Sequence, residues 1–140
     1  MIDPELERRL RAGFARWNEG ERVFDPRWTH PDVEIHSAIG DFTGATYRGQ
    51  EGVAQWVADM AEAFDEWRLE LDELDEFAPG RVLGVGTAHL RGRGSGVSVD
   101  QPCAWIFDHV DGVLTRFEPF LNRVEEARAI AAADSPPDRG

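Results

Sequence analysis

The sequence contains a single cysteine, no lysine and no long apolar run. Cys103 has no second cysteine to pair with, which excludes an intrachain disulfide and any zinc site built on paired cysteines. Nowhere do about 18 apolar residues follow one another, and the N-terminal stretch MIDPELERRLRAGF lacks the apolar core of a signal peptide. We therefore expect a cytoplasmic protein without a membrane segment.

Basic residues are scarce relative to acidic ones, with 15 against 27 and a net charge of -12. A field of this sign repels phosphate backbones and anionic lipid, so neither nucleic acid nor a membrane is expected as a partner. The 41% of hydrophobic residues is enough for a packed core. At 140 residues the chain is expected to form one domain, over residues 1–133, with a flexible polar tail at 134–140.

Hydrophobic periodicity predicts helices first and strands afterwards. Asp3 and Pro4 have the chemistry of a helix start, and Gly20 that of a helix end. Between them Leu6, Leu10, Phe14 and Trp17 form one apolar stripe. Further helices are expected at 21–28, which Pro26 opposes, at 50–64 and at 123–133. Strands are expected at 33–37, 67–71, 81–90, 97–107 and 113–121, with turn sequences that suit antiparallel neighbours. The pattern predicts an α+β fold with helices on one face of a sheet.

Three segments carry a family resemblance: FARWNEGE at 14–21, YRGQEGV at 47–53, and DGVLTRFEPFLNRVEEA at 111–127. Together they resemble the nuclear transport factor 2-like superfamily, and within it the bacterial SnoaL-like group. The resemblance runs from about Leu6 to Ala132 and implies a cone of about three helices on a curved antiparallel sheet of four to six strands. The superfamily includes ketosteroid isomerases, limonene epoxide hydrolases, polyketide cyclases, dehydratases and non-catalytic binding domains, so the fold alone selects no activity.

The resemblance to ketosteroid isomerases places their general base at His36. The base is an aspartate in those enzymes, but a histidine titrates near neutrality and can also move a proton. Strand alternation sets Glu34 on the same face, about 7 Å away, and Val33 and Ile35 on the other. We therefore name His36 and Glu34 as candidate catalytic residues, with an exposed polar strand face as the alternative.

Other functional groups of these enzymes have no counterpart. The isomerase tyrosine falls on Gly13 and its protonated aspartate near Cys103 or Ala104, so the two donors that stabilise a dienolate are missing. The acidic residue of the epoxide hydrolases falls on Pro119. Steroid isomerisation and epoxide hydrolysis are therefore not expected.

His89 and Asp100 flank the turn RGRGSG and form a second candidate pair. Depending on the register of this hairpin, the two side chains stand opposite each other or on different faces of the sheet. An exposed stabilising contact is the competing interpretation.

The segment HPDVEIH at 30–36 places His30, Asp32, Glu34 and His36 at every second position. Side chains on one face of a single strand run parallel and do not converge on a point, and no second cluster supplies further ligands. No metal site is therefore expected, and the cofactor-free proton-transfer chemistry considered below requires no cofactor.

Aromatic residues are the strongest indication of a ligand site. Those expected to converge on the cone are Trp17, Trp28, Trp56, Trp67, Trp105 and Phe117. We expect a small, mostly apolar, planar or polycyclic organic ligand, with cofactor-free isomerisation, cyclisation or dehydration as the chemistry if the protein is an enzyme. A non-catalytic binding or association module is the alternative. We also expect a homodimer through the sheet face, with Arg116, Glu118 and Phe120 in the interface.

Overall fold

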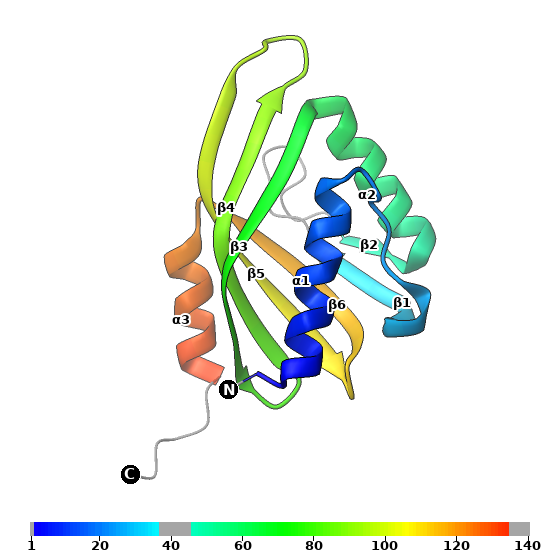
Figure 1. Ribbon diagram of the computed structural model, residues 1–140, viewed down its shortest axis with the longest axis vertical. Coiled ribbons are helices and arrows are strands. Elements are labelled where there is room, and N and C mark those ends of the chain that lie inside the picture. The colour runs from blue at the N-terminus through cyan, green and yellow to red at the C-terminus, as the bar shows by residue number, and fades with distance from the viewer. Residues whose placement is uncertain (1, 37–45, 135–140) are drawn as a thin grey trace.

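The computed structural model describes residues 2–36 and 46–134 (Figure 1). The helices are α1 (Pro4–Asn18), α2 (Gly49–Ala63) and α3 (Val124–Asp134), with a short 3-10 turn η1 (Pro26–Trp28). The strands are β1 (Thr29–His36), β2 (Thr46–Arg48), β3 (Phe64–Ala78), β4 (Arg81–Gly92), β5 (Ser98–Val110) and β6 (Val113–Leu121). In the part of the chain that is described, no helix combines the length and the apolar character that crossing a bilayer requires.

The strands form one curved, open sheet in the order β2-β1-β6-β5-β4-β3. Strands β3 to β6 make an antiparallel meander, as the turn sequences predict. The pairing of β1 with β6 is parallel, so the sheet is mixed where an antiparallel one was expected. The two strands can run in the same direction because more than seventy residues separate them and no hairpin constrains their pairing.

Alternation along β5 divides the core into two layers. Cys103, Trp105 and Phe107 point to one face and join the cluster packed under α1 and α2. Ala104 and Ile106 point to the other face, where Ala127 of α3 covers them. Figure 1 shows α1 in front of the sheet, with α3 to one side near β3 and β4. The expected α+β cone is confirmed, with α3 as the short C-terminal helix.

The helix expected at 21–28 is wrong. Residues 21–25 are not helical, and only η1 forms, with the side chain of Asp25 accepting a hydrogen bond from the backbone N–H of Arg27 at 2.9 Å. Pro26 at the first position of this turn has no N–H to continue an earlier helix. The short turn brings Trp28 directly before β1, at the edge of the cavity described below.

The start of α1 has the predicted chemistry. The side chain of Asp3 accepts a hydrogen bond from the backbone N–H of Leu6 at 3.0 Å, and Pro4 occupies the first turn, where its missing N–H costs nothing. At the other end Gly20 adopts a φ of 99°, which favours glycine.

Replacing Asp3 by alanine should lower the free energy of unfolding by about 1 kcal/mol, because one N-terminal N–H of α1 loses its acceptor. Urea unfolding monitored by circular dichroism measures the change. The matched control is Glu19→Ala at the other end of α1, where Glu19 is exposed and uses only its backbone N–H in the cap. An Asp3→Ala midpoint equal to that of the control would contradict a capping role.

Candidate functional site

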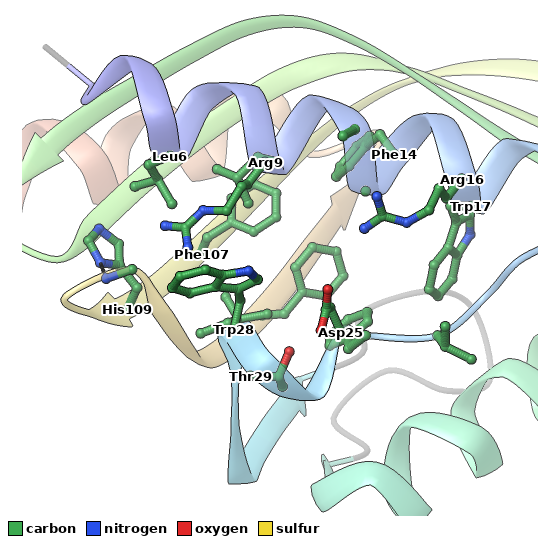
Figure 2. A pocket seen from close by; sticks show the side chains of 18 of the residues that line it. Leu6, Arg9, Phe14, Arg16, Trp17, Asp25, Trp28, Thr29, Phe107 and His109 are labelled. Carbon is green, nitrogen blue, oxygen red and sulfur yellow. Dashed lines mark hydrogen bonds between the residues drawn. The ribbon is translucent and has the colours of Figure 1, made fainter.

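A cavity of about 220 Å³ lies between α1 and the sheet, next to η1 (Figure 2). Its walls come from α1, from the segment between α1 and β1, from α2 and from β3 to β6. The lining residues are Leu6, Arg9, Leu10, Ala12, Gly13, Phe14, Arg16, Trp17, Val23, Phe24, Asp25, Arg27, Trp28, Thr29, Trp56, Leu69, Val82, Phe107, His109, Gly112, Leu114 and Phe117. Most of these side chains are apolar or aromatic, which is the composition of a site for an organic molecule.

Helix α1 leaves room for this cavity at one position. Arg9, Gly13 and Trp17 are spaced by four residues, so they follow one another along the face of α1 that lines the cavity. Gly13 has no side chain, and a Cβ placed there would meet no atom within 4 Å. The gap between Arg9 and Trp17 is therefore a direct consequence of the glycine.

The inner end of the cavity is aromatic. The Trp17 and Trp56 rings lie 5.7 Å apart, and Trp56 also contacts Phe117 at 5.8 Å. Phe24 meets Trp17 at 5.9 Å and Phe117 at 5.7 Å. These tilted and edge-on contacts hold the aromatic wall in one arrangement.

Of the six aromatic residues singled out from the sequence, Trp17, Trp28, Trp56 and Phe117 line this cavity, whereas Trp67 and Trp105 do not. Trp67 packs edge-on against both Trp17 and Trp56 at 5.1 Å, and Trp105 packs edge-on against Phe14 at 5.1 Å. These two residues stand behind the wall and support it.

Three polar atoms in the cavity wall are buried without a hydrogen-bond partner in the described part of the chain. They are Nε1 of Trp17, Nε1 of Trp56 and Nε of Arg9. Buried donors in native proteins are nearly always satisfied, by protein, water or ligand. The three nitrogen atoms have almost no exposed surface, so they lie behind the surface that the cavity presents to a ligand.

Asp25 and His109 are the carboxylate and the imidazole in the wall, and both are engaged. Arg27 donates to Asp25 at 2.8 and 3.2 Å, and these hydrogen bonds lower the pKa of Asp25 to about 2. The backbone N–H of Gly112 donates to Nδ1 of His109 at 3.0 Å, which places a proton on Nε2, 2.9 Å from Oε2 of Glu76. Neither group is available as a free base.

The candidate pair His36 and Glu34 lies on the opposite face of the sheet and does not line the cavity. Val33 and Ile35 point inward from the same strand and are fully buried, as alternation predicts. Nε2 of His36 is 2.8 Å from Oε1 of Glu34, and the two side chains are 30% and 34% exposed. This hydrogen bond, with the nearby charge of Arg48, holds the pKa of Glu34 below its usual value. The pair is therefore part of a half-exposed ion-pair cluster, away from the aromatic wall.

The secondary pair His89 and Asp100 stands opposite in the β4–β5 register. Nδ1 of His89 is 2.6 Å from Oδ1 of Asp100, and Nε2 is 3.0 Å from Oε1 of Glu70. These cross-strand contacts lie on the outer face, and neither His89 nor Asp100 lines the cavity. They link β3, β4 and β5.

Two other residues of the sequence analysis are buried. Phe120, expected in a dimer interface, is covered in the cluster beneath α3, while Arg116 forms an ion pair with Glu118 at 2.8 Å.

Cys103 is buried, and burial raises the pKa of its thiol to about 12, so the thiol is inert. Among residues 2–36 and 46–134 there is no cluster of three or more metal-ligating side chains of the His, Cys, Asp and Glu types.

Arg9, Gly13, Asp25 and His109 line the cavity but were not identified as site residues from the sequence. The four-residue spacing of Arg9, Gly13 and Trp17 is the signal that could have identified the first two. Asp25 and His109 reach the wall from a loop and from a strand end, positions that only the tertiary structure reveals.

Solved structures share this fold. The chain is similar to an NTF2-like protein of unknown function from Burkholderia pseudomallei K96243 (TM-score 0.73, 19% identity, 90% of this chain and 97% of that chain). It is also similar to TerC co-crystallised with polyporic acid (TM-score 0.69, 23% identity, 89% and 97% covered). A third similar structure is a protein of ketosteroid isomerase-like fold from Catenulispora acidiphila DSM 44928 in complex with trimethylamine (TM-score 0.66, 17% identity, 85% and 86% covered).

A search of curated proteins finds no match. The family model for the SnoaL-like domain matches residues 10–117, which include most of α1 and every strand except the end of β6. The resemblance to the nuclear transport factor 2-like superfamily is thereby confirmed. The chain belongs to the SnoaL-like domain family.

Proposed function

We propose that this protein binds a small aromatic organic molecule in the cavity between α1 and the sheet. The observation that carries the proposal is the aromatic wall of the cavity, in which the Trp17 and Trp56 rings lie 5.7 Å apart and Trp56 contacts Phe117 at 5.8 Å. Aromatic rings favour a planar ligand through stacking and edge contacts.

The dimensions favour a ligand of one or two rings. The cavity volume of about 220 Å³ is below the roughly 300–1,000 Å³ that is usual for drug-sized ligands. Along α1, the eight steps from Arg9 to Trp17 span about 12 Å at a rise of about 1.5 Å each. Two fused rings with a short polar substituent match this length.

The polar groups of the wall favour binding over proton transfer. A general base must reach the substrate with a free lone pair and a suitable pKa. Asp25 is held by Arg27 with a pKa of about 2, and both ring nitrogens of His109 already have partners. Two similar proteins were crystallised with polyporic acid and with trimethylamine, which supports a ligand-binding role for folds of this kind.

Isothermal titration calorimetry with 2-naphthamide tests the proposal. This uncharged probe has two fused rings and an acceptor oxygen, with about 13 heavy atoms. At about 0.3 kcal/mol per heavy atom, we expect a binding free energy of about -4 kcal/mol, which corresponds to a Kd of about 1 mM or tighter. The melting temperature should rise with probe concentration, because a ligand of the folded state stabilises it.

His36→Ala serves as the matched control, because His36 lies on the other face of the sheet. Its affinity for 2-naphthamide should equal that of the wild type. Absence of both a binding heat and a shift in melting temperature up to the solubility of the probe would overturn the proposed function. A large loss of affinity in His36→Ala would move the site to the outer face.

A further inference from the structure

Arg9 stands out among the charged groups of the cavity wall. The others are Arg16, Asp25, Arg27 and His109. Arg27 is neutralised by Asp25 at 2.8 Å, and Arg16 faces Glu21 at 4.0 Å. His109 contacts Glu76 at 2.9 Å. Among the residues that the structure describes, no carboxylate pairs with Arg9, so its positive charge is uncompensated within the wall.

The Arg9 guanidinium is also held in place. Its Cζ lies 3.8 Å from the centre of the Trp28 ring, and Nε is buried without a hydrogen-bond partner in the described chain. Figure 2 shows the Arg9 side chain descending from α1 over Trp28, with His109 toward one end of the cavity and Trp17 toward the other. Stacking uses the face of the guanidinium and leaves the N–H groups at its edge free to bind an anion.

The two ends of the cavity therefore have different chemistry. Arg9 supplies a cation near η1, and the aromatic wall built on Trp17 and Trp56 lies about two helical turns further along α1. The whole chain carries a net charge of -12, which repels anions in bulk solution. An unpaired arginine inside a mostly apolar cavity counters that field locally, because charge interactions are stronger where water is excluded.

From this arrangement we infer that the ligand is an aromatic carboxylate, whose anionic group is bound by Arg9 while its ring or rings occupy the aromatic end of the cavity. This inference rests on the proposed function, since it assigns the charge class of the molecule that the same cavity binds. A planar guanidinium matches a carboxylate with two parallel hydrogen bonds, which selects this anion over a neutral amide. An amine carrying the same ring should be repelled by Arg9.

Three probes with one ring system test the inference by calorimetry at pH 7: 2-naphthoate, 2-naphthamide and 2-naphthylmethylammonium. We expect 2-naphthoate to bind at least about tenfold more tightly than 2-naphthamide, which is the usual scale of a charge-assisted hydrogen bond. The ammonium probe should bind more weakly than the amide. Raising the salt concentration should reduce the advantage of the carboxylate.

Arg9→Gln should remove the preference, weakening 2-naphthoate about tenfold more than it weakens 2-naphthamide. Arg9→Lys keeps the charge but loses the bidentate geometry, so it should retain part of the preference. The matched control is Arg8→Gln, since Arg8 precedes Arg9 on α1 but points to solvent and pairs with Glu5. Arg16→Gln tests the other arginine of α1 in the wall.

The outcomes separate the two claims. If 2-naphthamide binds but 2-naphthoate binds no more tightly, the carboxylate inference falls and the proposed function stands. If the preference survives Arg9→Gln but disappears in Arg16→Gln, the role of Arg9 is overturned. If none of the three probes binds the wild type, both claims fall together.

Discussion

Replacing Trp56 by alanine is expected to destabilise the fold by about 3–5 kcal/mol, the range for truncating a buried tryptophan. Trp56 is 2% exposed, and its ring contacts those of Trp17, Trp67 and Phe117 at 5.7, 5.1 and 5.8 Å. It joins α2 to the sheet and to α1, and alanine would leave a cavity that its rigid aromatic neighbours cannot close. Urea unfolding should show a large fall in the midpoint with an unchanged slope.

Trp28→Ala is the matched control for this change. Trp28 also lines the cavity, but it is 43% exposed and packs against the guanidinium of Arg9, so less apolar burial is lost. We expect a cost of about 1 kcal/mol, mostly from the lost stacking with Arg9. A destabilisation by Trp56→Ala no larger than that of Trp28→Ala would show that the aromatic cluster does not organise this end of the core.

The helices and strands of this fold were largely predictable because their signals are local. The cap at Asp3, the apolar stripe of α1 and the turns between β3 and β6 depend on neighbours close in sequence. The parallel pairing of β1 with β6 was not predictable, since it joins distant segments that no turn connects. The helix expected at 21–28 does not form, because Pro26 lacks the N–H that a helix through this segment would need and the hydrophobic periodicity of the segment is weak.

The position of the candidate residues depends on contacts between elements that are distant in sequence, which local patterns do not determine. Alternation correctly separated Glu34 and His36 from Val33 and Ile35, but it carries no information about which face the helices cover. The buried face of β1 turned out to be the helix side, so the polar pair faces outward. Four of the six predicted aromatic residues line the cavity, because large aromatic side chains gather wherever helices and sheet converge.

The residue that creates the cavity carries no side chain, which is why sequence patterns overlook it. In the comparison with ketosteroid isomerases, Gly13 marks the absence of a catalytic tyrosine. In the structure Gly13 leaves part of the cavity open, because a side chain at this position would fill the space between Arg9 and Trp17 on the same face of α1. A glycine inside a helix costs about 1 kcal/mol relative to alanine, and in this helix that cost accompanies a cavity.

Replacing Gly13 by leucine is expected to weaken binding of 2-naphthamide by about 100-fold. The four added carbon atoms would occupy the space between Arg9 and Trp17 and exclude part of the ring system. Losing the burial of four carbon groups at about 0.8 kcal/mol each amounts to about 3 kcal/mol, or roughly 100-fold in Kd. Since a Kd of about 1 mM would rise toward about 0.1 M, calorimetry should detect no binding heat from the variant, and thermal unfolding establishes that it is folded.

The sign of the stability change makes this variant informative. Leucine has a better helix propensity than glycine by nearly 1 kcal/mol, and its side chain would bury apolar surface in the cavity, so the melting temperature should not fall. The matched control is Ala15→Leu, which places the same side chain on the exposed face of α1 and should leave affinity unchanged. A Gly13→Leu variant that remains folded and binds 2-naphthamide like the wild type would show that the ligand does not occupy the space beneath Gly13. Binding lost together with a higher melting temperature would instead tie the ligand to that space, because the variant is folded and its one change adds a side chain inside the cavity.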